Sequence, residues 1–271
     1  MLTYKLEEIW IYPVKSLGGI RLPSAKVMEK GLQYDRRYML VDESNKFITQ
    51  RAFPLMSQFK LENPGESFLI RFEGDSIEIP KSPVSIGDLF DATIWDDTVE
   101  VTELSKEVSH WFSQKMKLTC KLVFFPEGND RLVDQAYSTN QEHVSLADGY
   151  PFLIIGQRSL DDLNNRLGEP ISMKRFRPNL VFSGGEPFAE DSWQEFTIGD
   201  NRFINLKLCA RCVLTTIDPE TGKQGTEPLA TLATFRRIDN KVNFGANLVA
   251  VDHNMIKEGD KIQIHSNVQL I

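Results

Sequence analysis

The chain has 271 residues, with 41% hydrophobic and 25% charged residues, which is typical of globular proteins and argues against a disordered or fibrous one. Its net charge of -7 argues against non-specific binding to nucleic acid or anionic membranes, because the summed field repels polyanions. No stretch approaches the roughly 18 consecutive apolar residues of a membrane span, and the start lacks an apolar run of signal-peptide length. We therefore expect a cytoplasmic protein that does not bind membranes.

The first hundred residues are predicted to form short strands. Turn-forming residues such as Gly18-Gly19 and Asn63-Pro64-Gly65 separate the apolar runs, and this spacing is typical of a small β-barrel or sandwich. The predicted strands cover residues 8–12, 25–28, 38–42, 47–49, 68–72, 76–79 and 93–95.

The second half mixes helices and strands. Helical periodicity begins at Thr102, a candidate N-cap, and a second helix is predicted from Ser159 to Gly168. A third helix is predicted to begin with Pro228 at its first position. The predicted strands cover residues 118–125, 151–156, 179–183, 196–198, 203–208, 213–217, 244–251 and 261–265. The whole is mostly β with some α, divided into domains at 1–98 and 99–271.

The three cysteines are too few for a disulfide framework, which agrees with a reducing compartment: Cys120, Cys209 and Cys212. Cys209 and Cys212 form a Cys-x-x-Cys pair, but a structural zinc site needs two more ligands, and the four histidines are scattered. A dithiol motif usually starts a helix, whereas β-branched residues follow Cys212 and predict a strand. We interpret Cys209 and Cys120 as buried packing residues. Cys212, beside an arginine, is the candidate nucleophile or soft metal ligand.

Two basic motifs could bind an anion. Arg175 and Arg177 would point to one face of an extended segment, where a phosphate or oxyanion would relieve their repulsion; the alternative is a solvated or salt-bridged pair. Lys15-Ser16, followed by Gly18-Gly19, offers an ammonium group, a hydroxyl and a glycine backbone that a phosphate can approach closely. The glycine spacing is not that of a Walker loop. Surface ion pairs are the expected role of Arg36, Arg37 and Arg51.

Several motifs in order resemble the MOSC proteins, named for the C-terminal domain of molybdenum cofactor sulfurase, and specifically the amidoxime-reducing component and its bacterial relatives. The motifs are 13–16 (PVKS), 35–36 (DR), 176–179 (FRPN), 190–193 (EDSW), 211–212 (RC) with 214–216 (LTT), 218–222 (DPETG) and 244–245 (FG). The likeness runs nearly end to end. It implies an N-terminal β-barrel-like domain packed on a β-barrel MOSC domain with peripheral helices.

The resemblance also implies a molybdenum cofactor, in which a pterin dithiolene holds the metal and carries a phosphate. By position, Cys212 would be the thiolate ligand of molybdenum and a catalytic residue, with Asp148 and Arg211 as candidate proton donors. The implied cofactor-binding residues are Lys15, Ser16, Arg36, Arg177, Asn179, Ala210 and Asn247. The chain departs from the pattern at Arg37, where an aromatic residue often stands, and at Ala210, which lacks a hydroxyl found in some relatives.

The implied activity is reduction of small N-hydroxylated substrates: hydroxylamines, amidoximes and N-hydroxylated bases. Because no cysteine follows Cys212 to hold a ferredoxin-type cluster, we expect the electrons to come from a separate ferredoxin, flavin or haem protein. The alternative is a carrier of the cofactor or its sulfur, with Cys212 as acceptor. The sequence leaves open whether the polar stretch 129–150 folds over the site.

Overall fold

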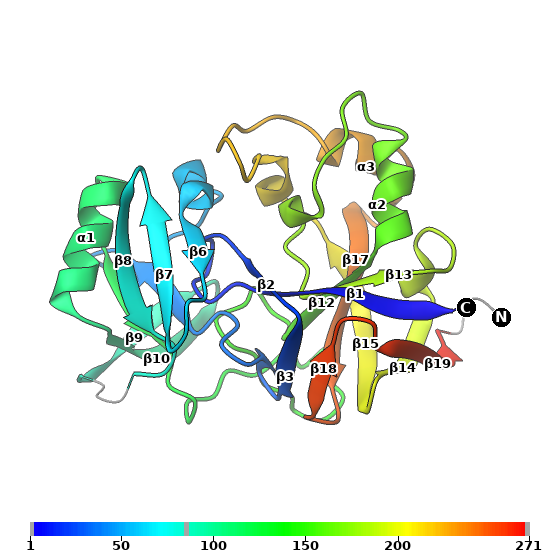
Figure 1. Ribbon diagram of the computed structural model, residues 1–271, viewed down its shortest axis with the longest axis horizontal. Coiled ribbons are helices and arrows are strands. Elements are labelled where there is room, and N and C mark those ends of the chain that lie inside the picture. The colour runs from blue at the N-terminus through cyan, green and yellow to red at the C-terminus, as the bar shows by residue number, and fades with distance from the viewer. Residues whose placement is uncertain (1–2, 84–86, 269–271) are drawn as a thin grey trace.

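A computed structural model describes residues 3–83 and 87–268 of the chain. Its largest unit in these residues is a closed seven-stranded barrel in the order β12-β13-β1-β19-β14-β15-β17, with β17 pairing back to β12 (Figure 1). All neighbours are antiparallel except β12 and β13. The strands are β1 (Tyr4–Ile11), β12 (Phe152–Gly156), β13 (Leu180–Ser183), β14 (Trp193–Ile198), β15 (Asn201–Ala210), β17 (Lys241–Ala250) and β19 (Lys261–Asn267).

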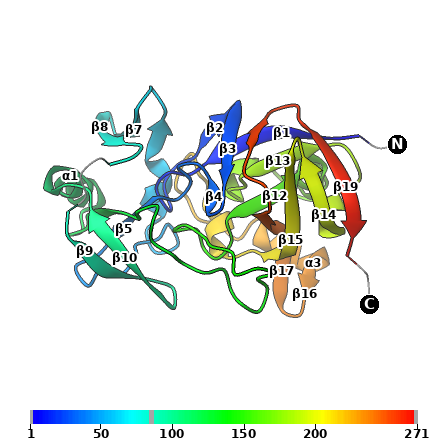
Figure 2. The same cartoon turned by 90° about the horizontal axis from the view of Figure 1, so that it is seen from below.

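Strand β1 closes the barrel although it comes from the other end of the chain. It pairs with β13 on one side and with β19 on the other (Figures 1 and 2). Leu6, Ile9 and Ile11 are buried in the core that β1 shares with the other strands, as expected for a half-buried strand. The barrel therefore needs both ends of the chain.

A glycine marks the closest approach of two barrel strands. Gly245 of β17 has a φ of +81°, and a Cβ there would lie 2.7 Å from Ile155 Cγ1 and 2.8 Å from the Ile154 carbonyl oxygen of β12. This close approach explains the glycine of the Phe244-Gly245 motif.

Three smaller sheets complete the described structure. One has the order β5-β11-β10-β9, the second β6-β7-β8, and the third β18-β3-β4, which joins both ends of the chain. Their strands are β3 (Ser24–Met28), β4 (Gly31–Leu32), β5 (Tyr38–Val41), β6 (Lys60–Glu62), β7 (Ser67–Phe72), β8 (Asp75–Pro80), β9 (Leu89–Ile94), β10 (Asp97–Glu103), β11 (Lys121–Phe124) and β18 (Met255–Lys257). Short strands β2 (Ile20–Leu22) and β16 (Arg237–Ile238) pair with β1 and β17.

Three α-helices accompany the sheets in the described residues: α1 (Lys106–Met116), α2 (Gln157–Asn164) and α3 (Leu229–Phe235). The expectation of a mostly β fold with some α is confirmed. None of the helices seen in this part of the chain has the length and apolar character that crossing a bilayer would require.

The division of the chain at residue 98 stays a prediction. In the structure this position lies inside β10, and β11, which begins only at Lys121, still pairs with β10 and β5. The first strand, β1, belongs to the barrel formed otherwise by the second half.

Several predicted boundaries were wrong. Thr102 lies in β10, and the N-cap of α1 is Ser105, whose Oγ accepts a hydrogen bond from Val108 N at 3.1 Å. Cys120 lies just before β11 rather than within a strand. Helix α2 begins at Gln157, before Ser159, and ends at Asn164, well before Gly168. Pro228 is the N-cap of α3 rather than its first residue.

Residues 213–217 were predicted as a strand and instead contain a 3-10 turn, η4 (Val213–Thr216). The side-chain oxygens of Thr215 and Thr216 bond back to the carbonyl oxygens of Cys212 and Val213, at 3.0 and 2.8 Å. These local bonds favour a turn over an extended chain and override the β-propensity of the segment.

The Glu190-Asp191-Ser192-Trp193 motif ties α2 to the barrel. Glu190, in η3 (Ala189–Asp191), is fully buried and accepts hydrogen bonds from Gly156 N at 3.1 Å and Ser159 Oγ at 2.9 Å, at the start of α2. Burial raises the pKa of Glu190 to about 7, against the opposing effect of these bonds. The motif therefore has a structural role.

This raised pKa predicts a pH-dependent stability. An acid with a folded pKa of about 7 and an ordinary value of 4.5 contributes stability that is present below pH 4.5 and is lost as the pH rises to 7. Between pH 5 and pH 8 we expect the free energy of unfolding of the wild type to fall relative to that of Glu190→Gln by up to about 3 kcal/mol. Urea unfolding of both proteins at the two pH values measures this difference; parallel pH dependences would contradict it.

Candidate active site

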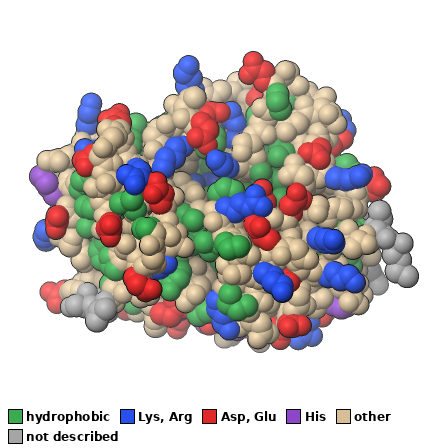
Figure 3. Space-filling view, viewed as in Figure 1, with side chains coloured by type: hydrophobic (Ala, Val, Ile, Leu, Met, Phe, Trp, Pro, Cys, Tyr) green, Lys and Arg blue, Asp and Glu red, His purple; other side chains and the backbone are tan. Residues whose placement is uncertain are grey.

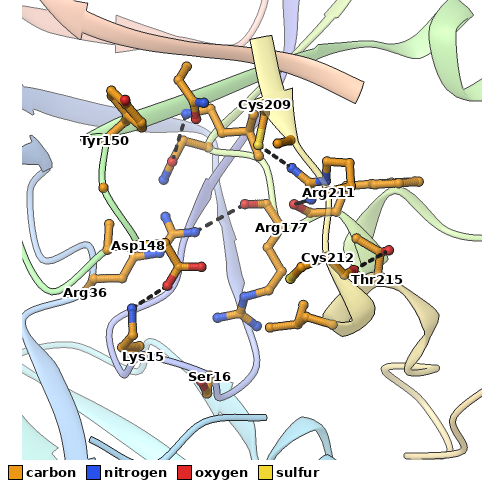
Figure 4. A pocket seen from close by; sticks show the side chains of 18 of the residues that line it. Lys15, Ser16, Arg36, Asp148, Tyr150, Arg177, Cys209, Arg211, Cys212 and Thr215 are labelled. Carbon is orange, nitrogen blue, oxygen red and sulfur yellow. Dashed lines mark hydrogen bonds and ion pairs between the residues drawn. The ribbon is translucent and has the colours of Figure 1, made fainter. Parts of the chain in front are cut away.

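All ten residues predicted to form the site line one cavity of about 550 Å³ (Figure 4). They converge from both halves of the chain: Lys15, Ser16, Arg36, Asp148, Arg177, Asn179, Ala210, Arg211, Cys212 and Asn247. A cavity of this size accommodates a cofactor-sized ligand.

Cys212 lies between the end of β15 and the turn η4, whose N-cap it forms. Its carbonyl oxygen accepts bonds from the backbone N and the Oγ1 of Thr215, at 3.1 and 3.0 Å, which fix the residue. Its Sγ, half-buried at the cavity wall, accepts a hydrogen bond from Arg51 Nε at 3.1 Å. The guanidinium of Arg51 thus gives this sulfur a charge-assisted hydrogen bond.

Cys209 was predicted to be a packing residue, and this was wrong. It is half-buried, lines the same cavity as Cys212, and its Sγ accepts a hydrogen bond from Arg211 Nη1 at 2.9 Å (Figure 4). Since a 3-10 turn follows Cys212, one argument against dithiol chemistry also fails. The prediction that Cys120 is buried is confirmed, at 3% exposure.

Arg51 is the main site residue that the sequence did not reveal. Besides its bond to Cys212, its Nη2 lies 2.7 Å from Asp148 Oδ2, and its guanidinium lies over the Trp95 ring, 4.2 Å from the centroid. Its predicted role in a surface ion pair was therefore wrong, because the side chain is directed into the cavity. The same expectation was wrong for Arg37, which is buried outside the cavity lining and pairs with Glu127.

Lys15, Asp148 and Arg51 form a charge network. Lys15 Nζ lies 2.6 Å from Asp148 Oδ1 and donates to the Leu146 carbonyl oxygen at 2.8 Å (Figure 4). Burial lowers the pKa of Lys15 to about 8, although Asp148 opposes the shift. The Asp148 side chain is 57% exposed; partial desolvation in the cavity would raise its pKa, but Lys15 and Arg51 outweigh this effect and hold the pKa well below its usual range. Asp148 is therefore a carboxylate at neutral pH.

Arg36 and Arg177 form a second cationic layer around Tyr12. Their guanidinium carbons lie over the Tyr12 ring, 4.3 and 4.2 Å from its centroid. Arg36 Nη2 donates to the Arg177 carbonyl oxygen at 3.2 Å, and Arg177 Nη1 donates to the Leu17 carbonyl oxygen at 2.6 Å. Burial lowers the pKa of Arg177 to about 10, which reflects the cost of desolvating this charge.

The predicted pairing of Arg175 with Arg177 on one extended face was wrong. Arg175 ends the 3-10 turn η2 (Met173–Arg175), and its Nη2 binds Asp218 Oδ2 at 2.9 Å, outside the lining of this cavity. Arg175 is therefore salt-bridged, as in the alternative interpretation, and only Arg177 reaches this cavity, although both arginines border a second, smaller cavity.

Four of the described lining residues adopt left-handed backbone conformations: Ser16 (φ 71°), Arg36 (φ 48°), Trp95 (φ 54°) and Arg177 (φ 55°). Such conformations are uncommon for residues other than glycine and tend to persist where function requires them. Each lies in a segment between strands, and each of these residues lines the cavity.

The polar residues of the cavity lining differ in whether their side chains already form hydrogen bonds within the protein. The amide of Asn179 already donates to the Trp10 carbonyl oxygen at 3.1 Å and accepts from Leu153 N at 3.3 Å, so it shapes the wall. Within the described residues the side chains of Ser16 and Asn247 make no hydrogen bond, which leaves them available to a ligand. Ala210 contributes only its backbone and methyl group.

The stretch 129–150 forms a wall of the cavity. Arg131, 6% exposed, donates to the carbonyl oxygens of Ser145, Ala147 and Asp148 and so fixes the end of the loop. Residues 147–150 line the cavity, and Lys207 Nζ of β15 lies 3.7 Å from the centroid of the Tyr137 ring.

The charge of the cavity is opposite to that of the chain. Among its described lining residues six are cationic and Asp148 is the one carboxylate, whereas the chain as a whole has a net charge of -7. The six are Lys15, Arg36, Arg51, Arg177, Lys207 and Arg211. Such a cavity attracts a large anion and presents a cysteine sulfur to it.

Comparisons with known proteins agree with this site. The family model described as "MOSC domain" matches residues 141–263, and the "MOSC N-terminal beta barrel domain" matches residues 3–118. The chain therefore belongs to the family of MOSC proteins with this N-terminal domain.

Individual relatives are of two kinds. The chain is 32% identical to the mitochondrial amidoxime-reducing component 1 of Mus musculus, over 86% of this chain and 71% of that protein. It is 30% identical to the component 1 of Homo sapiens, over 95% of this chain and 82% of that protein. It is also 32% identical to the molybdenum cofactor sulfurase of Arabidopsis thaliana, over 91% of this chain but only 33% of that protein.

The contact of Arg51 with Cys212 predicts a difference in thiol reactivity. Arg51→Met keeps the length of the side chain and removes the donor. We expect alkylation of Cys212 by iodoacetamide at pH 7 to slow by roughly three- to tenfold, because the variant loses the charge-assisted hydrogen bond that Arg51 donates to the sulfur. Trypsin cuts after Arg211, so mass spectrometry reads the two cysteines in separate peptides. Arg71→Met, which breaks an exposed pair with Glu62, is the control; equal or faster alkylation in Arg51→Met would contradict the prediction.

Proposed function

We propose that the cavity binds a molybdenum cofactor and that the protein uses it to reduce N-hydroxylated substrates. The observation that carries this proposal is the Cys212 sulfur, hydrogen-bonded to Arg51, in the wall of a large cavity lined by six cations. The names of the amidoxime-reducing relatives support the reaction, and that of the sulfurase supports the cofactor.

The residues present fit this cofactor. A thiolate is a suitable ligand for a soft, sulfur-bound metal, and Cys212 would be that ligand. The cations of the cavity would offset the negative charges of the dithiolene and phosphate, with Lys15, Arg36 and Arg177 the most buried. Ser16 and Asn247 would add hydrogen bonds. The wall beside them would be shaped by Asn179 and Ala210.

The cofactor, when bound, would supply a two-electron centre able to take up the substrate oxygen. Overall, the N–O bond breaks, two electrons and two protons are consumed, and the amine and one water are formed. The protein would bind and orient the reactants and hold protons. Asp148, kept ionised by Lys15 and Arg51, would position these two cations and would not donate a proton. Lys15, with its pKa near 8, can hold or release a proton at physiological pH.

Arg211 would act through its charge. Its Nη2 donates to the Phe176 carbonyl oxygen at 2.5 Å and its Nη1 to Cys209, so the guanidinium is fixed at the cavity wall. Since arginine does not deprotonate in proteins, Arg211 is not a proton donor in this proposal. The electrons would come from a separate ferredoxin, flavin or haem protein, and a cytoplasmic location remains our prediction.

The second candidate function is a carrier of the cofactor or its sulfur. One observation favours it: two half-buried cysteines, Cys209 and Cys212, line the same cavity, and a molybdenum cofactor sulfurase is among the relatives. A carrier would release the cofactor or its sulfur, whereas a reductase would retain it through turnover.

Metal analysis tests the ligand assignment. In protein produced by a host that makes the cofactor, we expect nearly one molybdenum per chain in the wild type and in Cys209→Ser, and loss of most of it in Cys212→Ser, because only the latter removes the proposed ligand. Inductively coupled plasma mass spectrometry gives the ratio. Equal molybdenum in the two variants would overturn the role of Cys212.

Turnover tests the reaction. Purified molybdenum-loaded protein is expected to convert a hydroxylamine or amidoxime to its amine when a reduced viologen dye supplies electrons, and not without a donor, because the chain would lack its electron partner. Chromatography of the amine measures the product. If fully loaded protein shows no turnover with any donor, the carrier function is favoured instead.

A further inference from the structure

A second cavity, of about 150 Å³, lies next to the first and shares Arg177 and Leu214 with it. Its wall includes four cations from both halves of the chain: Lys60, Lys174, Arg175 and Arg177. Glu220 is the one carboxylate among its described lining residues. On the face drawn in Figure 3, basic and acidic side chains gather around a hollow between the two parts of the molecule.

A buried amide in this cavity lacks a partner. Gln50 is 3% exposed, lines the cavity, and its Oε1 has no hydrogen-bond partner in the described structure. A buried polar group without a partner is costly, so such groups are normally satisfied by protein, water or ligand. An amide can present either its oxygen or its N–H groups to a ligand. Gln50 therefore indicates a polar ligand.

Two of the four cations in this cavity, Lys60 and Lys174, share one carboxylate, and a third, Arg175, pairs with Asp218. Glu220 Oε2 lies 3.1 Å from Lys60 Nζ, and Glu220 Oε1 lies 3.1 Å from Lys174 Nζ. The turn around it is fixed by Asp218, whose Oδ1 accepts from the backbone N of Glu220 and of Thr221 at 2.9 and 2.8 Å. Figure 1 shows this segment, in gold, reaching across towards β6. Two ammonium groups on the two oxygens of one carboxylate form a clamp that an oxyanion also fits.

These ion pairs are exchangeable. The side chains of Lys60, Lys174 and Glu220 are 45%, 49% and 58% exposed, and pairs so exposed to water contribute little stability. A ligand with more charge or more oxygens than a carboxylate can therefore displace Glu220 at low cost.

The backbone of Gly18 and Gly19 lines the same cavity. A Cβ at Gly18 would lie 2.7 Å from the Phe59 carbonyl oxygen, and one at Gly19 would lie 2.5 Å from the Tyr12 ring. Only glycine fits at these two positions. The small cavity thus uses the glycines and the Asp218–Gly222 motif, neither of which has a role in the first cavity.

We propose that this second cavity is a binding site for a compact oxyanion, a phosphate group. The phosphate displaces Glu220 and forms the ion pairs with Lys60 and Lys174 in its place. Arg175, Arg177 and Gln50 complete the site. The phosphate could be free, part of a small phosphorylated metabolite, or the phosphate end of a ligand in the first cavity that reaches past Arg177. The site does not depend on the function proposed above.

Inorganic phosphate binding to the full, cofactor-free chain tests the proposal by isothermal titration calorimetry. In Glu220→Gln the competing carboxylate is gone and both lysines remain, so we expect phosphate to bind roughly fivefold more tightly than to the wild type. Glu78→Gln makes the same charge change at an exposed position outside the cavity and should leave the affinity unchanged. All these positions are exposed or half-exposed, so the variants should fold.

The location of the bound phosphate is tested by adding Lys60→Gln and Lys174→Gln to the Glu220→Gln protein. We expect this triple variant to lose the gain. If the tighter phosphate binding persists in the triple variant, the phosphate lies in the first cavity. If Glu220→Gln binds phosphate no more tightly than the wild type, Glu220 does not compete for the lysines. Either result overturns the proposal. Repeating the titration with cofactor-loaded Glu220→Gln distinguishes the sources: loss of binding identifies the phosphate of the larger ligand, and unchanged binding identifies a free or metabolite phosphate.

Discussion

The structure depends on the insertion of β1 between β13 and β19. This pairing closes the barrel, and it also carries the residues after β1 along the barrel towards the segment after η2. Trp10 N donates to the Asn179 carbonyl oxygen at 2.8 Å, and the Tyr12 hydroxyl donates to the Pro178 carbonyl oxygen at 3.1 Å. Lys15 and Ser16 follow directly. A cationic site built from both ends of a long chain is thereby fixed by main-chain hydrogen bonds rather than by flexible loops.

Ion pairs and hydrogen bonds from the protein explain how six cations lie close together around one cavity. Asp148 accepts from Lys15 and Arg51, Asp35 pairs with Arg36 at 2.6 Å, and carbonyl oxygens accept from Arg177 and Arg211. The lowered pKa of Lys15 and of Arg177 shows that this compensation is incomplete. An anion in the cavity would offset part of this desolvation cost.

The same logic relates the two cavities. In the smaller cavity Glu220 neutralises two lysines, whereas in the larger cavity Asp148 alone faces six cations. Arg177 borders both, so occupation of one cavity affects the charge felt in the other. The two cysteines likewise differ in their partners: Cys212 accepts a hydrogen bond from Arg51 of the N-terminal half, and Cys209 accepts one from Arg211, two residues further along the chain.

The sequence by itself determined the chemical inventory and most of the strands. The turn-bounded apolar segment at residues 8–12 and the continuous apolar run of β12 predicted strands there, because local patterns of residue type are visible in the sequence. The resemblance to the MOSC proteins implied ten site residues, and these ten do line one cavity. Prediction from the sequence failed where local hydrogen bonds outweigh β-propensity, as in η4, and where the burial of a side chain depends on distant segments. Only the tertiary structure decided that Arg51 reaches Cys212, that Cys209 faces the cavity, and that Arg175 turns away to Asp218. These contacts join residues far apart in the chain, and no local pattern specifies which side chains the closure of the barrel brings together.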